Sequence, residues 1–366
     1  MTTGFLHHES YLWHDTRSAG LYLPAGGMVQ PGEHAENPET KRRLRSLLEV
    51  SGVMDHLVQL APRPATEDEV LRFHTRDYIE SLKTMSAGNG GMAGEGTPFG
   101  PGSWEIALLS TGGVIRALDA VVEGEVDNAY ALVRPPGHHA EKDEGRGFCM
   151  LGNAVIAIKH AQAVHGLGRV ATVDWDVHHG NGTEHGFYDD PSVLTISIHQ
   201  DDNFPTGSGK LEDRGEGAGE GYNINVPLPP GSGHDAYVAT FEQVVAPALR
   251  AFKPDLIVVP SGFDASIYDP LGRMMATSET YRRMTEILMA TAAEVCGGRL
   301  MMCHEGGYSV AYVPFCGLAV MEVMSGANSG VEDPFYAAAS SDGGGGIMPH
   351  QAAVVDAAAA VASAIT

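Results

Sequence analysis

The chain has 366 residues, and its 46 Asp and Glu against 23 Lys and Arg give a formal net charge of −23. That length is enough for one large α/β domain with a substantial core. The negative charge argues against nonspecific nucleic-acid binding and against docking on an anionic membrane, and no apolar run is long enough to span a bilayer. The four cysteines form no Cys-x-x-Cys pair and no secretory signal is visible, so we expect buried thiols in a cytoplasmic protein.

The first third of the chain mixes irregular segments with helices. Residues 1–40 are expected to be mostly loop, and a helix then opens at Asn37–Thr40 and ends at Ser51-Gly52. The stretch 86–103 contains seven glycines and two prolines. Loops of that length inside a compact domain are usually lids or binding loops, so we predict a Gly-rich loop there. Helical spacing returns at Trp104–Val122.

From Ala129 onwards, short apolar strands alternate with helices. The strands are expected at 129–133, 170–173, 193–198, 256–260 and 300–303, and the helices at 154–164, 236–252 and 281–295. This alternation predicts a parallel sheet that is buried on both faces. We predict a single domain over residues 1–366, with a Gly run at 343–346 and a helical tail at about 350–366.

Polar clusters follow the predicted strands, at the end where open α/β sheets bind their ligands. Asp174, Asp176 and His178 occupy alternate positions, so their side chains leave one face of an extended chain. Crowded carboxylates repel one another unless a cation lies among them. With Asp264 after another strand, Asp176 and His178 match the donor set of a catalytic zinc. The alternative is that these residues only cap strand ends.

Two histidines and a tyrosine are the other candidates for chemistry. His138 and His139 follow a rigid Pro-Pro-Gly turn, and histidine is the side chain best suited to move protons near neutral pH. Asp174 is a candidate partner for one of them and the neutral Asn181 for the other. Tyr308 follows two glycines and would donate a hydrogen bond to a developing oxyanion. The alternatives are a surface histidine pair, extra metal ligands and a packing tyrosine.

Further aromatic and histidine residues fall in loops and helices. Phe148 and Phe204 either line a narrow channel or are packed down. His199 is a conceivable fourth metal ligand. The remaining histidines, at positions 7, 8, 14, 160 and 165, are interpreted as surface or core fillers.

Taken together, these segments resemble the zinc-dependent histone deacetylase superfamily. Five motifs carry the resemblance, in the family's order between about Pro38 and Met324: Arg134–Ala140, Gly147–Cys149, Asp174–Gly180, Ser261–Asp264 and Glu305–Tyr308. Pro135-Pro136, Asn181 and Tyr222–Pro227 look most like the class II branch and its bacterial amidohydrolases.

The resemblance implies an arginase-like α/β fold with a central, mostly parallel sheet of about eight strands flanked by helices. It also implies roles for individual residues. One Zn²⁺ per chain would be held by Asp176, His178 and Asp264. His139, supported by Asn181, would be the general base and acid, His138 with Asp174 would act electrostatically, and Tyr308 would polarise the carbonyl. The acyl-lysine channel would be formed by Gly147, Phe148 and Phe204, with Leu271 near its rim.

The resemblance also implies structural potassium sites. One would involve Asp174, Asp176, His178, Ser197 and Ile198, and the other the region of Phe187, Asp190, Val193 and Tyr222.

The resulting prediction is a zinc-dependent deacetylase, a hydrolase of a linear amide bond, acting on N-ε-acyl-lysine or a similar small acyl-amine. Three alternatives stay open: an acetylpolyamine deacetylase with the same site, a dimanganese ureohydrolase that would need more Asp and His ligands, and a non-catalytic acyl-lysine-binding or small-molecule-binding protein. We expect no nucleic-acid or membrane partner. The Gly-rich loop and the first forty residues are candidate lids or contacts in a homo-oligomer.

Overall fold

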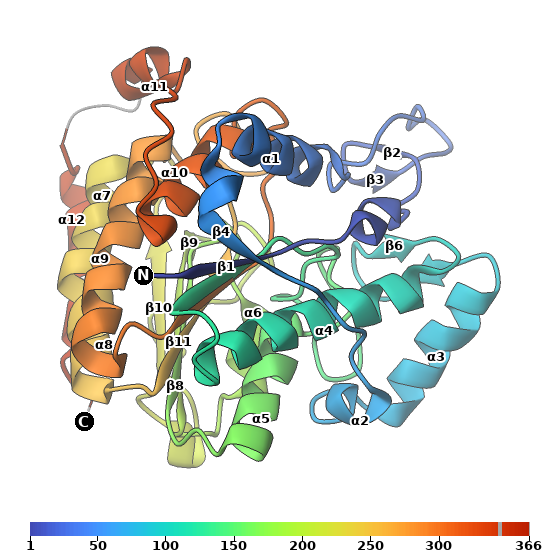
Figure 1. Ribbon diagram of the computed structural model, residues 1–366, viewed down its shortest axis with the longest axis horizontal. Coiled ribbons are helices and arrows are strands. Elements are labelled where there is room, and N and C mark those ends of the chain that lie inside the picture. Colours follow the sequence, from blue (N-terminus) through green and yellow to red (C-terminus); the bar gives the residue numbers. More distant parts are fainter. Residues whose placement is uncertain (343–345, 366) are drawn as a thin grey trace.

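An eight-stranded, entirely parallel sheet runs through the centre of the molecule (Figure 1). The computed structural model describes residues 1–342 and 346–365, so most of the Gly run at 343–346 and the last residue of the predicted tail lie outside it. In spatial order the strands are β10 (Asn223–Leu228), β9 (Val193–Gln200), β8 (Val170–Asp174), β11 (Leu256–Ser261), β12 (Leu300–His304), β7 (Asn128–Ala131), β1 (Thr3–Leu6) and β4 (Leu57–Leu60). The predicted parallel sheet of about eight strands is confirmed.

Three of these strands were not predicted. β1 lies inside residues 1–40, which were expected to be mostly loop, and it pairs with both β4 and β7. β1 and β4 have four residues each, too few to show a period. β10 contains two asparagines and a proline, which weakens its strand signal. The expectation of a loop was therefore wrong for Thr3–Leu6, which form a strand inside the sheet.

Helices cover both faces of the sheet and make two separate hydrophobic layers. One face carries α1 (Glu39–Val50), α7 (His234–Thr240), α8 (Ala246–Phe252), α9 (Ser278–Cys296), α10 (Val313–Ser325) and α12 (Pro349–Ala362). The other face carries α2 (Glu67–Val70), α3 (Arg76–Ala87), α4 (Ser103–Val122) and α5 (Asn153–His165). Successive strand residues alternate between the layers, as Val170 and Ala171 do.

The remaining elements lie outside these layers or interrupt them. The predicted helix at 236–252 is divided by a π-helical segment, Phe241–Val245. The Gly-rich loop contains a small hairpin of β5 (Gly91–Met92) and β6 (Pro98–Phe99). A second hairpin, β2 (Ala19–Gly20) with β3 (Leu23–Pro24), projects from the body near β6 (Figure 1). The other short helices are α6 (Asn181–Gly186) and α11 (Tyr336–Asp342), and the 3-10 turns are Glu9–Trp13, Val53–His56 and Gly217–Gly219.

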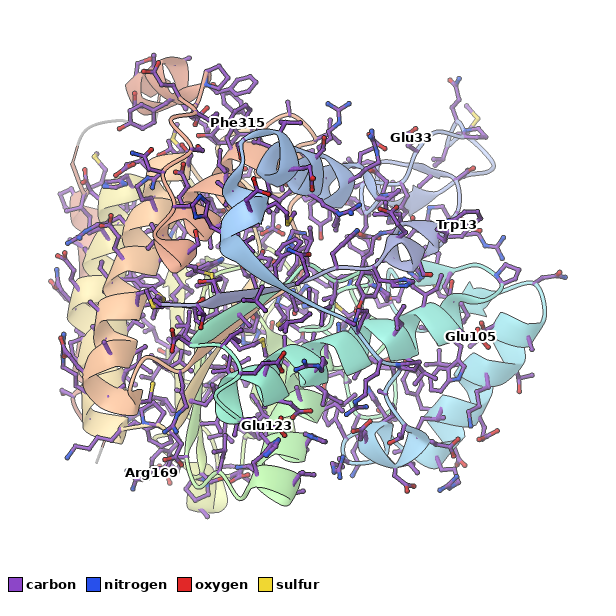
Figure 2. All side chains as sticks on the ribbon, in the orientation of Figure 1. Trp13, Glu33, Glu105, Glu123, Arg169 and Phe315 are labelled. Carbon is purple, nitrogen blue, oxygen red and sulfur yellow. The ribbon has the colours of Figure 1, made fainter. Side chains whose placement is uncertain are left out.

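The N-terminal segment carries several exposed apolar side chains. Trp13, labelled in Figure 2, is 80% exposed. Met28, in the turn between Gly26 and Val29, is fully exposed. Leu21, Tyr22 and Leu23 are about half exposed. Within the described residues, no helix combines the length and the apolar character needed to cross a membrane.

A buried ionic cluster fixes the end of this segment to the sheet. Glu36 accepts hydrogen bonds from Arg134 Nε and Lys41 Nζ, each at 2.9 Å, and all three side chains are about 1% exposed. Burial by itself raises the pKa of Glu36, but the two cations outweigh it and hold the pKa well below its usual range.

We expect Glu36→Gln to lower the free energy of unfolding by about 3–5 kcal/mol, because it leaves two buried cations without their counter-charge. Glu39→Gln, which breaks a partly exposed pair with Arg42, should cost less than about 1 kcal/mol. Because the pKa of Glu36 is lower in the folded state than in the unfolded state, its carboxylate contributes fully to stability at a pH above the unfolded-state pKa of about 4.3. That contribution to the free energy of unfolding is lost as the pH falls through the folded-state pKa. Urea unfolding followed by circular dichroism measures both variants, and equal losses would contradict the assignment.

Candidate active site

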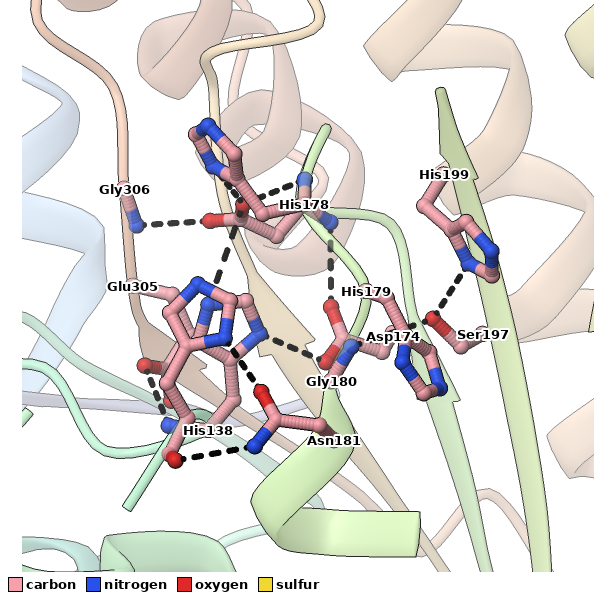
Figure 3. Close-up of polar contacts among 12 residues, drawn as sticks. His138, Asp174, His178, His179, Gly180, Asn181, Ser197, His199, Glu305 and Gly306 are labelled. Carbon is pink, nitrogen blue, oxygen red and sulfur yellow. Dashed lines mark hydrogen bonds and ion pairs between the residues drawn. The ribbon is translucent and has the colours of Figure 1, made fainter. Parts of the chain in front are cut away.

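Four neighbouring strands, β8, β11, β12 and β7, end at the same edge of the sheet, and the segments that follow them carry the candidate residues. Because the strands are parallel, residues as far apart in the sequence as His138 and Gly306 meet there (Figure 3). The segments are residues 134–139 after β7, 174–178 from the last residue of β8, 261–264 from the last residue of β11, and 305–308 after β12. The predicted meeting of these polar clusters therefore occurs.

Asp176, His178 and Asp264 form a buried cluster whose ligand atoms lie within 4.8 Å of one another. His178 Nδ1 is 3.0 Å from Asp176 Oδ1 and 3.1 Å from Asp264 Oδ2. The buried Asp264 Oδ2 has no hydrogen-bond partner, an arrangement that is costly unless a cation satisfies it. Two carboxylates and one imidazole, with an unsatisfied oxygen facing the imidazole, fit a divalent metal such as zinc.

Backbone amides and a glycine hold these carboxylates in place. The backbone N–H of Gly306 donates to Asp176 Oδ2 at 2.8 Å, and that of Val177 donates to Asp264 Oδ1 at 2.8 Å. A Cβ atom at Gly306 would lie 2.1 Å from Asp264 Oδ2 and 2.9 Å from the hydroxyl of Tyr308. Only glycine therefore fits at this point, between the carboxylates and the phenol.

The two histidines have different partners. His138 Nδ1 donates to Asp174 Oδ2 at 2.9 Å, whereas His139 Nδ1 lies 2.8 Å from Asn181 Oδ1 (Figure 3). Burial alone lowers the pKa of His138, but Asp176 and Asp174 outweigh it and raise the pKa to about 10. Burial and the neighbouring imidazoles of His138 and His178 lower the pKa of His139 well below its usual value. The pair therefore combines a charged ring with a neutral one.

A cavity of about 550 Å³ opens onto this cluster. His139, His178 and Tyr308 lie on its lining together with the four residues predicted for the channel, Gly147, Phe148, Phe204 and Leu271. Phe204 packs edge-on against His139 with ring centroids 5.0 Å apart, and Phe148 packs likewise against Tyr308 at 5.8 Å. At Gly147, where φ is +49°, a Cβ would lie 2.4 Å from the His139 ring. The residues beside His139, His178 and Tyr308 are thus mainly apolar.

Comparison with known proteins agrees with this geometry. Residues 34–324 match the model of the histone deacetylase domain. A histone deacetylase-like amidohydrolase from Pseudomonas aeruginosa is 53% identical over 335 residues, covering 91% of this chain and 88% of that protein. The chain belongs to the histone deacetylase family. It is accordingly an amidohydrolase, an enzyme that acts on an amide bond.

More distant relatives share both the sequence and the fold. Histone deacetylase 8 of Arabidopsis thaliana is 41% identical and covers 86% of this chain and 85% of its own. A probable deacetylase of Archaeoglobus fulgidus is 37% identical, with coverages of 91% and 89%. The crystal structure of the HDA15 HD domain superposes with a TM-score of 0.83 at 32% identity, covering 98% of each chain. The similarity to the family is therefore not confined to the five short motifs but covers most of the chain.

Sequence reasoning missed two buried carboxylates in this deacetylase-family site. Glu305 Oε2 accepts from the backbone N–H groups of Gly137 at 2.6 Å and His138 at 3.0 Å, which fixes the turn that carries both histidines. Asp269 Oδ2 accepts from the backbone N–H of Tyr308 at 2.7 Å. Glu305 belongs to the Glu305–Tyr308 motif, but no role was predicted for it, because its backbone partners lie about 168 residues away in the sequence.

Other predictions about the site have different outcomes. His199 does not join the metal cluster, because its two ring nitrogens lie 2.9 Å from Ser197 Oγ and from the carbonyl oxygen of Gly209. The spacing alone had suggested that Asp174 converges on the metal with Asp176 and His178, and the structure shows that it does not. Asp174 bonds to His138 instead, as the resemblance implied. All four cysteines are free and buried, as expected.

Proposed function

We propose that this enzyme is a zinc-dependent deacetylase that removes a short acyl group from the ε-nitrogen of lysine. The observation that carries the proposal is that His139, His178 and Tyr308 line one largely apolar cavity together. These three are at most 9% exposed, so they lie deeper than Leu21, Tyr22 and Leu23 on the same lining, which are 44–52% exposed. Asp176, His178 and Asp264 would hold one Zn²⁺ per chain. When bound, zinc polarises the scissile carbonyl and makes the attacking water more acidic.

His139 is proposed as the group that moves the proton. Since Asn181 Oδ1 accepts from Nδ1, the lone pair of the neutral ring is on Nε2. That nitrogen would take a proton from the attacking water and then give it to the departing amine. His138, held charged by Asp174, would stabilise the negative charge that develops on the acyl carbon's oxygens.

Tyr308 is proposed to donate a hydrogen bond to the carbonyl oxygen of the substrate. Burial raises the pKa of the Tyr308 phenol well above its usual value, so its proton is retained at neutral pH. The methylene chain of lysine would lie between Phe148 and Phe204, where apolar walls exclude water.

The charges around the cavity favour acyl-lysine over an acetylated polyamine. Glu95 is the one carboxylate among the described lining residues, and it pairs with Arg146 at 2.8 Å. Arg273 also lines the cavity, and its guanidinium donates to the carbonyls of Pro270 and Gly272 rather than to an acid. The remaining ammonium groups of a polyamine would meet this unneutralised cation and be repelled.

The test is metal content measured together with acetate release from a small panel of acyl-amines. We expect about one catalytic zinc per chain and faster turnover of an acetyl-lysine peptide than of an N-acetylated spermidine. Faster turnover of the polyamine would favour the acetylpolyamine alternative. Retention of the peptide without any acetate would favour a non-catalytic binding protein.

Asn181→Asp should shift the acidic limb of the pH–rate profile upwards by about 1–2 pH units. His139 acts as a base only when neutral, and a carboxylate at Nδ1 raises its pKa, so the ring becomes protonated, and inactive, at a higher pH. Asn181→Ser, which adds no charge, is the control and should lower kcat without an upward shift. An unchanged acidic limb of the pH–rate profile in Asn181→Asp would show that Asn181 does not set the pKa of the catalytic base.

We further propose, from the family resemblance, two structural potassium sites. Support for the first is that Ser197 stands opposite Asp174 in the ladder of β8 and β9. Support for the second is a tight turn in which the backbone N–H of Asp190 donates to the carbonyl oxygen of Phe187 at 3.0 Å. This turn leads into β9 at Val193, and Tyr222 directly precedes β10, the strand that pairs with β9. Most of the ligands would be backbone carbonyls.

A further inference from the structure

A second group of metal-ligating atoms lies between helices α4 and α5, outside the catalytic cavity. Asp119 belongs to α4, and His160 and His165 belong to α5, which packs against α4 on the same face of the sheet (Figure 1). Asp119 Oδ1 is 3.2 Å from His160 Nε2 and 2.9 Å from His165 Nε2. Asp119 Oδ1 and a nitrogen of each histidine therefore converge, all within 4.8 Å of one another.

His160 is oriented by a second carboxylate on its far side. Its Nδ1 lies 3.2 Å from Glu69 Oε1, with Arg72 Nη1 further off at 3.5 Å. A carboxylate beside one ring nitrogen, with the other nitrogen facing the ligand cluster, is the arrangement that usually orients a metal-binding histidine. With the Glu69 carboxylate beside Nδ1, the other ring nitrogen, Nε2, faces Asp119 and His165, where a bound metal would take its lone pair.

Glu69 is itself held rigidly. It accepts from both Nη atoms of Arg63, at 2.9 and 2.7 Å, and from the backbone N–H of Thr66 at 2.7 Å in the capping box of α2. Three helices and a fixed carboxylate thus define where the His160 ring points. Such support is what distinguishes an organised ligand set from a chance meeting of polar side chains.

Burial and access are also suited to an ion. His160 is 6% exposed, while the side chains of Asp119 and His165 are 16% and 15% exposed. The inner ligand is therefore shielded and the outer two border solvent, from which water can fill the remaining coordination positions. Two imidazoles and a carboxylate suit zinc and the neighbouring transition metals better than magnesium or calcium.

We propose that Asp119, His160 and His165 form a second site for a transition-metal dication such as zinc, which joins α4 to α5. The site does not depend on the proposed deacetylase function. A hydrogen-bonded network that binds no metal is the alternative. In the sequence these two histidines were interpreted as surface or core fillers, because nothing local indicated Asp119 and Glu69 as their partners.

The test counts zinc in variants that separate the two sites. The protein is stripped with a chelator, dialysed against micromolar Zn²⁺, freed of unbound metal and analysed by mass spectrometry. We expect about two zinc ions per wild-type chain and about one in His165→Gln, with acetate release retained. Asp264→Asn should keep about one, and the double variant should keep none.

Two further measurements keep the result interpretable. In the Asp264→Asn background, Zn²⁺ should raise the Tm, and His165→Gln should abolish that rise. His234→Gln, a partly buried histidine whose Nδ1 lies 3.3 Å from the Thr280 hydroxyl rather than near an acid, is the control and should bind as much zinc as wild type. If Asp264→Asn retains no zinc and shows no Zn²⁺-dependent Tm, or if His165→Gln and wild type bind equal amounts, the second site does not exist.

Discussion

Tyr308→Phe is expected to lower kcat by about 10²–10³-fold, the usual cost of losing one oxyanion donor. Zinc content should stay unchanged, because the tyrosine is not among the ligand atoms. The ring itself should not move: its backbone N–H is held by Asp269 and its edge packs against Phe148. Acetate release and metal content, measured on the same sample, check both parts of the expectation.

A matched tyrosine provides the control for that experiment. Tyr312 is fully buried and accepts from the backbone N–H of Ser278 through its hydroxyl at 3.0 Å, but it does not line the cavity. Tyr312→Phe should therefore cost about 1 kcal/mol of stability and leave turnover nearly unchanged. Near-normal turnover in Tyr308→Phe would remove Tyr308 from the mechanism.

Asp264→Asn should weaken binding of the catalytic zinc by more than about 100-fold, since even residues that only support ligands cost 10–100-fold. Asparagine keeps the shape of the side chain but removes the charge, and Oδ2 has no other partner that would hold it. Acetate release should fall in parallel with the loss of the catalytic zinc, while any zinc at the proposed Asp119 site remains. Both are measured after dialysis at a fixed free zinc concentration.

Asp269→Asn is the appropriate comparison, because Asp269 is another buried carboxylate near the site that contacts backbone N–H groups rather than the ligand cluster. This variant should keep the catalytic zinc while lowering turnover through the position of Tyr308. An Asp264→Asn protein that is fully loaded and active would show that the ligands had been assigned incorrectly.

The parts of this site that could be predicted from sequence are those encoded locally. Asp174, Asp176 and His178 directly follow one apolar run, so their place at the end of a strand could be predicted, although β8 ends at Asp174 and residues 176–178 form a bend rather than an extended segment. The sheet could be predicted because its inner strands are continuous apolar runs. These features need no knowledge of distant residues.

The parts that could not be predicted depend on contacts across the chain. Glu305 binds a backbone turn about 168 residues away, and Glu36 meets Arg134 about 98 residues away. In the sequence, nothing distinguishes a glutamate that will be buried against distant partners from a glutamate on the surface. The strand β1 was missed because its place between β4 and β7, rather than its composition, makes it a strand.

The anchoring of the N-terminal segment has a consequence for how this protein can diversify. Arg134 donates to the carbonyls of Tyr11 and His14 on one side and to the carboxylate of Glu36 on the other. Residues 15–35 between these anchors supply Leu21, Tyr22 and Leu23 to the outer wall of the cavity. This part of the outer wall therefore comes from a stretch that carries none of the proposed reacting groups. Part of the substrate selectivity is thus set by a stretch of the chain that is separate from the reacting groups, and natural or laboratory evolution can vary that part without changing the chemistry.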